Sequence, residues 1–129
     1  MELERVSIMP TMDDYSCVSF ENFKEFEKEL PKQAKELMDY AEEGEWQDNE
    51  INVYYDISGY ADYEVREGWY ADLLNCDLAE LDYHGAPSLY GYIDFDKLGQ
   101  DLIDAGDPTC TFETSDHKVI ETSYGWDIR

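Results

Sequence analysis

Residues 51–57 read Ile51-Asn52-Val53-Tyr54-Tyr55-Asp56-Ile57, and this run decides the class of fold. Apolar residues at every second position give the period of a β-strand with one buried face. The pair Ser58-Gly59 then ends the predicted strand. From Tyr60 to about Asn75 the period changes to that of a helix, because four apolar residues stand four apart: Ala61, Val65, Trp69 and Leu73.

Upstream of this strand the sequence predicts a helical hairpin over residues 19–44, after an irregular or short-strand lead-in over 1–18. Ser19 can cap a first helix, whose apolar residues recur at threes and fours until Pro31: Phe20, Phe23, Phe26 and Leu30. Pro31 suits the first turn of a second helix, for which Gly44 can act as the C-cap. The apolar face of this second helix consists of Ala34, Leu37, Met38 and Ala41.

Downstream, residues 76–91 are punctuated by His84-Gly85-Ala86-Pro87 and predict a connecting loop. Asp94 can cap a short helix that ends at Gly106 and whose inner face holds Phe95, Leu98 and Leu102. Two alternating runs over 110–114 and 119–124 flank a turn and predict a terminal β-hairpin.

Together these elements predict an α+β protein. It has an N-terminal helical hairpin, a central strand and helix, and a C-terminal helix packed on a small antiparallel β-hairpin or sheet. We place a boundary between a helical part with one strand, residues 1–57, and a C-terminal part, residues 58–129. Phe20, Phe23, Phe26 and Trp69 are expected in the core because they lie on predicted inner faces.

The composition joins extreme acidity to a normal supply of core residues. The chain has 129 residues, 32 acidic against nine basic, a formal charge of minus 23, and 15% aromatic residues including 11 tyrosines. Acidic disordered tails lack such aromatics, so a folded domain with a charged surface is expected. That charge disfavours nucleic acid and anionic membranes as partners. It equals the phosphate charge of roughly a dozen base pairs, about one turn of duplex.

The charge is also placed unevenly. Four lysines stand between residues 24 and 35, whereas residues 36–96 contain 17 acidic residues and one base, Arg66, a net charge of minus 16. Solubility alone needs a much smaller excess. A solvated acidic face is the plain alternative to a functional one.

No constellation of residues indicates catalysis, and we expect a protein that is not an enzyme. Dinucleotide, phosphate-loop, zinc-protease and nucleophile-elbow motifs are lacking, and pairs such as Asp94 and Asp96 arise by chance in so acidic a chain. The isolated thiols of Cys17, Cys76 and Cys110 indicate neither a disulfide framework nor a metal site, so no metal and no cofactor are expected. The sequence lacks a membrane-spanning run and a cationic leader, which favours the cytoplasm.

Three motifs in the C-terminal third resemble those of a known family. They are Pro87-Ser88-Leu89-Tyr90-Gly91-Tyr92-Ile93-Asp94-Phe95, then Leu98-Gly99-Gln100-Asp101-Leu102, then Thr111-Phe112 with Val119-Ile120-Glu121. In order and spacing this part of the chain resembles the ArdA antirestriction proteins, over about residues 50–124. Two features depart from the family: little of the chain is left for its N-terminal β-rich domain, and residues 78–86 are longer than the corresponding family segment.

The resemblance implies a DNA mimic from a phage or other mobile element that acts in the host cytoplasm. Members of the family are curved homodimers that occupy the DNA groove of type I restriction-modification enzymes. The resemblance implies that the homodimer contact lies within residues 78–94, for which we name Leu78, Leu81, Leu89 and Tyr92.

The predicted mimic face holds carboxylates that would meet the basic residues of a partner's DNA channel, with tyrosines as anchors. Its members are Asp39, Glu42, Glu43, Glu45, Asp48, Asp62, Glu64, Glu67, Asp72, Glu80 and Asp82, together with Tyr63 and Tyr70. The target stays open, because CRISPR effector nucleases also hold nucleic acid in basic channels. An acidic module that sequesters a basic DNA-binding protein is the alternative from another class.

Overall fold

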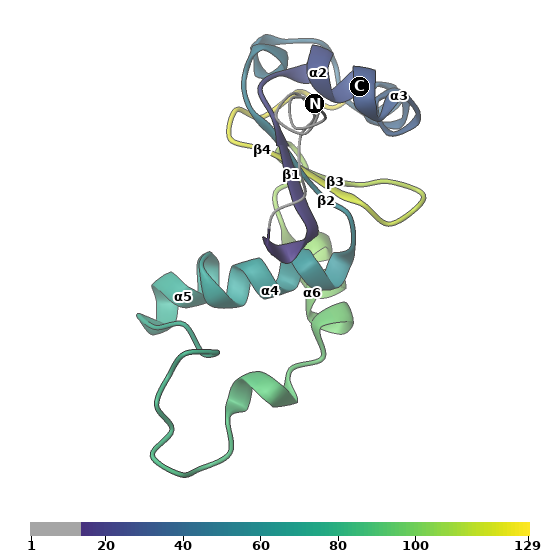
Figure 1. The fold of residues 1–129 in the computed structure, drawn as a ribbon. Coiled ribbons are helices and arrows are strands. Elements are labelled where there is room, and N and C mark those ends of the chain that lie inside the picture. Colours follow the sequence, from purple (N-terminus) through teal and green to yellow (C-terminus); the bar gives the residue numbers. More distant parts are fainter. Residues whose placement is uncertain (1–13) are drawn as a thin grey trace, which may run out of the picture.

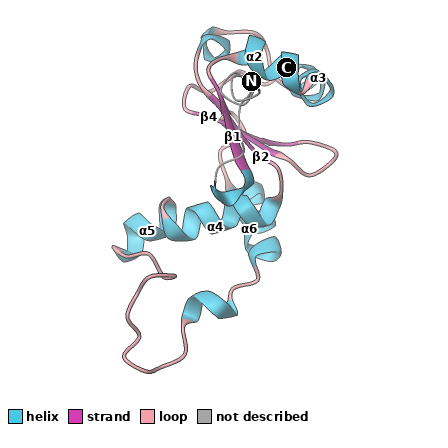
Figure 2. Ribbon diagram, viewed as in Figure 1, coloured by secondary structure: helices cyan, strands magenta, loops and turns pink. Residues whose placement is uncertain are grey.

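The structure is a computed structural model that describes residues 14–129; residues 1–13 of the predicted lead-in lie outside the described residues. A four-stranded antiparallel sheet in the order β1-β2-β4-β3 lies between two helical layers (Figures 1 and 2). Its strands are β1 (Cys17–Phe20), β2 (Ile51–Tyr54), β3 (Thr111–Glu113) and β4 (Val119–Thr122). The α+β prediction is therefore confirmed.

The helices fall into two groups along the chain, one before β2 and one between β2 and β3. Before β2 come η1 (Asp14–Ser16), α2 (Phe23–Glu29), α3 (Pro31–Tyr40) and η2 (Glu45–Asp48). Between β2 and β3 come α4 (Ile57–Arg66), α5 (Trp69–Leu74), η3 (Leu89–Tyr92) and α6 (Phe95–Ala105). Figure 1 shows residues 75–94, which we call the arm, projecting as a long open loop from the α4 and α6 layer.

One face of the sheet carries the larger core. Val53 of β2 lies between Val18 of β1 and Ile120 of β4, and all three side chains are buried. Helices α2 and α3 and the η2 turn cover this face and add Phe26, Leu37 and Trp46 to the same cluster. Because Trp126 also packs there, the C-terminal segment closes the layer on the N-terminal helices.

The opposite face is covered at one end only. Cys17, Tyr54 and Val119 are buried there with Tyr60 of α4, and Leu102 of α6 packs against them. Two glycines allow the close approach of backbones in this layer. A Cβ at Gly59 would lie 2.2 Å from the Tyr15 carbonyl oxygen, and one at Gly99 would lie 2.6 Å from the Ile57 carbonyl oxygen.

The predicted first helix is wrong at its start. Residues 17–20 form β1, and the helix begins at Phe23, where the Asn22 side chain accepts a hydrogen bond from the Glu25 amide at 3.0 Å. Phe20 is buried from the strand and not from the helix. Its spacing from Phe23 fits a helical period by coincidence, because both side chains enter the same core.

Three further boundaries differ from the prediction. Helix α3 ends at Tyr40, with Ala41 rather than Gly44 as its C-cap. Strand β2 ends at Tyr54, since Asp56 caps α4 by accepting a hydrogen bond from the Gly59 amide at 2.6 Å. Ser58-Gly59 therefore lies inside the first turn of α4, as does the predicted boundary at 57/58.

The predicted helix over 60–75 is two helices that meet at Gly68. The carboxylate of Glu64 accepts a hydrogen bond from the Trp69 amide at 2.8 Å, which starts α5 in a new direction. Trp69 is 65% exposed, so its placement in the core was wrong. The Asp94-capped helix, its stop at Gly106 and the terminal hairpin are confirmed, and α6 contacts β3 but packs mainly on α4.

Candidate partner-binding surface

The predicted acidic residues fall into two groups that lie on opposite sides of the sheet. The first, which we call the α3–η2 group, follows the end of α3 over the larger core (Figure 1). All five of its side chains are exposed: Asp39, Glu42, Glu43, Glu45 and Asp48.

The α3–η2 group is held by backbone contacts rather than by its own carboxylates. The Trp46 indole donates to the Glu42 carbonyl oxygen at 2.9 Å, and the Glu42 amide donates to the Asp127 carbonyl oxygen at 2.8 Å. Asp39 alone pairs with a base, Lys35, at 3.3 Å and in full exposure to solvent. Within residues 14–129 the other four carboxylates form no ion pair, so their charge faces solvent.

The second group, which we call the α4–arm group, comprises Asp62, Glu64, Glu67, Asp72, Glu80 and Asp82. Most of its members also accept hydrogen bonds that stabilise the local structure. Glu64 caps α5, Glu67 accepts a hydrogen bond from the Tyr15 hydroxyl, and Asp82 accepts one from the His84 amide at 2.8 Å. Asp72 and Asp82 are exposed.

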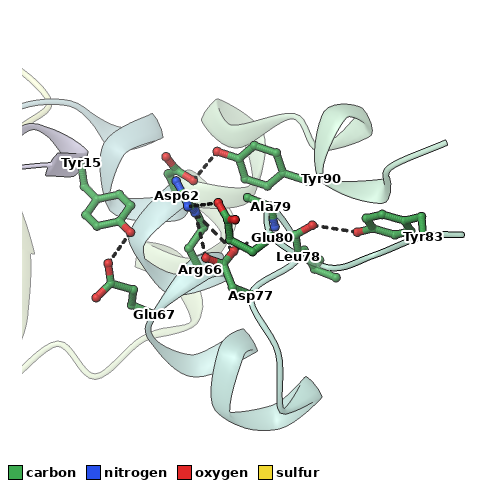
Figure 3. A network of polar contacts seen from close by, with 10 residues as sticks. All are labelled: Tyr15, Asp62, Arg66, Glu67, Asp77, Leu78, Ala79, Glu80, Tyr83 and Tyr90. Carbon is green, nitrogen blue, oxygen red and sulfur yellow. Dashed lines mark hydrogen bonds and ion pairs between the residues drawn. The ribbon is translucent and has the colours of Figure 1, made fainter. Parts of the chain in front are cut away.

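Arg66, at the end of α4, fastens both ends of the arm (Figure 3). Its guanidinium lies 3.2 Å from Asp77 and 3.3 Å from Glu80 near the start of the arm. The same guanidinium lies over the ring of Tyr90, 5.9 Å from its centroid, near the end of the arm. The Tyr90 hydroxyl donates to Asp62 at 2.8 Å, which ties that end to α4 a second time.

Between the contacts at its two ends, the arm contains a turn at residues 83–86. His84 and Gly85 adopt positive φ values of 54° and 93°, and the Ala86 amide donates to the Tyr83 carbonyl oxygen at 3.0 Å. The Tyr83 hydroxyl donates to the Leu78 carbonyl oxygen at 3.0 Å, so the ring folds back along the arm (Figure 3). The long loop is therefore ordered by local contacts.

The residues named as anchors and as dimer contacts are scattered over this region. Tyr63 is half-buried against the sheet, whereas Tyr70 and Leu78 line an apolar groove of about 440 Å³ between α5 and the start of α6. Leu81, Leu89 and Tyr92 are exposed along the arm, Tyr92 at 77%. The structure does not bring Tyr63 and Tyr70 into one cluster.

Two groups that sequence reasoning did not assign to a site are Arg66 and Glu121. In the sequence Arg66 is distinguished only as the one base in residues 36–96. A single base among so many acids indicates a structural ion pair, but the sequence does not give its partners. Glu121 faces the uncovered end of the sheet, where burial first and the neighbouring Glu64 carboxylate second raise its pKa to about 7. The alternating pattern predicts that Glu121 lies in a strand. Its burial was not predictable, because the residues around it, such as Tyr54 and Tyr63, come from β2 and α4.

In the part of the chain that the structure describes, no group of three or more His, Cys, Asp or Glu side chains is arranged to hold a metal ion. His84 and His117 lie in separate exposed turns, each with a left-handed backbone. Among the same residues, no helix has both the length and the apolar character needed to cross a bilayer.

No family model, no curated protein and no solved structure matches this chain. The resemblance to the ArdA family therefore stays a prediction from the quoted motifs.

Proposed function

We propose that this protein is an acidic DNA mimic from a phage or mobile element. It would inhibit a host-defence enzyme in the cytoplasm by occupying the basic channel into which DNA binds. A type I restriction-modification enzyme is the first candidate target, on the strength of the motif resemblance, and a CRISPR effector nuclease is the second. The mechanism requires no catalysis by this chain.

The observation that carries the proposal is the state of Arg66. It is the one base in residues 36–96, and its side chain is 29% exposed beneath Asp77, Glu80 and the Tyr90 ring. The exposed members of the α4–arm group, such as Asp72 and Asp82, therefore face solvent with hardly any positive charge from residues 36–96 beside them. A surface of one sign focuses its field, which attracts a basic channel and speeds association at low salt.

Short-range contacts would follow the electrostatic encounter. Trp69, Leu89 and Tyr92 are exposed beside the α4–arm group, and aromatic side chains are enriched among the residues that dominate binding energy at protein interfaces. The same arm is the expected contact of a homodimer by resemblance, and the mass of the protein in solution tests that part of the proposal.

The test is inhibition of DNA binding and cleavage by a purified type I restriction enzyme, repeated with a CRISPR effector nuclease. Reversal of four exposed carboxylates together should abolish inhibition: Glu43 and Glu45 of the α3–η2 group and Asp72 and Asp82 of the α4–arm group, all to lysine. Each single reversal should change it little, because each exposed pair contributes only about 0–1 kcal/mol. Added DNA should compete with the parent protein, and added salt should weaken the complex.

A matched set has the same change in net charge at other exposed acidic positions: Glu21, Glu27, Glu29 and Asp104, all to lysine. It should retain most of the inhibition if the α3–η2 group and the α4–arm group form the mimic surface. An equal loss of inhibition with both sets would show that inhibition depends on the net charge and not on where the carboxylates lie. Capture of many basic proteins, with no stoichiometric complex with either enzyme, would instead favour an acidic module that sequesters DNA-binding proteins.

A further inference from the structure

The uncovered end of the sheet contains a hollow of about 260 Å³, which we call the sheet hollow. Its walls include Tyr15, Asn52, Tyr54, Tyr63, Glu67 and Glu121. It opens where α4 and α6 stop covering the face, because Ser19 is exposed and Asn52 and Glu121 are half-buried there. This volume lies below the roughly 300–1,000 Å³ of sites for drug-sized ligands, so the sheet hollow suits the end of one side chain or a small molecule.

Three tyrosine rings form one wall of the sheet hollow. The rings of Tyr15 and Tyr63 meet edge to face at 5.6 Å, and those of Tyr54 and Tyr63 lie 5.9 Å apart. Tyr15 and Ser16 both adopt left-handed backbone conformations, with φ values of 70° and 56°, and the Tyr15 hydroxyl donates to Glu67. The rings are thus fixed in place before any ligand arrives.

Polar side chains of three neighbouring strands form the floor: Ser19, Asn52 and Glu121. Glu121 of β4 lies directly opposite Asn52 of β2, which in turn lies opposite Ser19 of β1. Within residues 14–129, Glu121 forms no ion pair with a basic side chain, and its nearest charged influence is another carboxylate, Glu64. A half-buried carboxylate without a cation is costly when ionised, so a cation that entered the sheet hollow would remove that cost.

Aromatic faces beside carboxylates favour an organic cation over an anion or a neutral molecule. Guanidinium fits this wall and floor better than ammonium, since it is planar, weakly hydrated, stacks on aromatic rings and carries five donors in one plane. We propose that the sheet hollow binds a guanidinium group between the rings of Tyr15, Tyr54 and Tyr63 and the carboxylates of Glu121 and Glu67.

The guanidinium site is tested separately from the proposed inhibition, because none of the carboxylates reversed in the inhibition test lines the sheet hollow. The guanidinium could belong to an arginine side chain of a partner protein or to a free small molecule. Both sources share the chemistry, and the experiment separates them.

The experiment is a titration of the full chain with methylguanidinium, followed by NMR of the tyrosine ring signals and of the Asn52 and Glu121 amides. We expect saturable shifts confined to the sheet hollow, and none with N-methylurea, which has a similar planar shape without the charge. The variant Glu121→Gln should bind methylguanidinium at least about tenfold more weakly, and Tyr63→Leu should also weaken binding.

Glu43→Gln removes the same charge from the α3–η2 group, on the other side of the sheet, and should leave the affinity unchanged. Equal weakening in Glu43→Gln and Glu121→Gln would overturn the proposal, as would shifts that do not saturate or equal binding of N-methylurea. A capped Gly-Arg-Gly peptide that binds more tightly than methylguanidinium would identify a protein side chain as the ligand. Exclusion of the peptide, with methylguanidinium still bound, would identify a small molecule.

Discussion

Glu121 carries its carboxyl group on a half-buried sheet face, close to the Glu64 carboxylate. Burial and this like charge raise its pKa from an ordinary value of 4.5 to about 7, although a Tyr54 hydrogen bond opposes the rise. Between these two values the folded protein binds a proton that the unfolded chain has released. The contribution of Glu121 to stability is therefore fully present below pH 4.5 and is lost as the pH rises through 7.

The variant Glu121→Gln keeps the shape of the side chain and cannot ionise. We expect it to be more stable than the parent at about pH 8, by up to about 3 kcal/mol, with the difference narrowing toward about pH 5.5. Urea unfolding at the two pH values measures this. Glu43→Gln, at an exposed position, is the control that should show no such pH dependence. A stability gain for Glu121→Gln that stays the same at both pH values would contradict the interpretation.

At the scale of elements, the arm depends on one residue of α4. Arg66 meets Asp77, Glu80 and the Tyr90 ring, and without it Asp62, Asp77 and Glu80 would repel one another with no cation between them. The Arg66 Nε–H donates to both carboxylate oxygens of Asp77 at 3.2 Å, and Nη2 donates to Glu80 at 3.3 Å, so one side chain holds two carboxylates by charge-assisted hydrogen bonds. The start and the end of the acidic arm are therefore both held by Arg66.

Replacement of Arg66 by methionine should release the arm while the sheet and its helical layers stay folded. We expect amide hydrogen exchange at Ala79 and His84 to accelerate by at least about tenfold, because both amides donate to carboxylates within the arm. Exchange in β2 and β4 should change far less. The matched control is Lys35→Met, which breaks an exposed pair with Asp39 on the other side of the sheet and should leave the arm unaffected. Unchanged exchange in the arm of Arg66→Met would show that Tyr90 and local turns suffice.

Local sequence signals predicted α6 and the hairpin of β3 and β4. Asp94 and Gly106 supply the two ends of that helix, and residues 110–124 pair with one another across a short turn. The short-strand alternative for the lead-in overlaps β1 only at Cys17 and Val18. The rest of β1 was not predicted, because its partner lies far along the chain: Cys17 pairs with Tyr54. A segment of four residues is too short to show a reliable period. Phe20, the last residue of β1, also fits the helical spacing of Phe23 and Phe26, so the sequence favoured a helix there.

The candidate surface was predicted in composition but not in arrangement. The excess of carboxylates over residues 36–96 is visible in the sequence, whereas their division between two sides of the sheet follows from the pairing of β2 with β1 and β4. The position of Trp69 was also not predictable from the spacing of apolar residues. Its apolar spacing continues that of Val65, but the Glu64 carboxylate starts α5 anew at Trp69 and turns the ring toward solvent.

At the scale of the molecule, the sheet separates the α3–η2 group from the α4–arm group (Figure 1). Exposed carboxylates therefore lie on both sides of the sheet. The larger core lies under α2 and α3, whereas the arm projects from the other layer with few contacts. The molecule thus combines a well-packed end with an extended acidic end.

A net charge of minus 23 on a folded chain of this length repels itself, so salt should stabilise the fold. Between about 0.01 M and about 1 M sodium chloride the Debye length falls from roughly 30 Å to roughly 3 Å, which removes most repulsion between exposed carboxylates. We expect the midpoint of thermal unfolding, followed by circular dichroism, to rise over this range. The amide variant of Glu42, Glu43, Glu45 and Asp48 should start from a higher midpoint and rise less. An equal rise in both proteins would mean that salt acts through the apolar core, and that self-repulsion does not limit the stability of this fold.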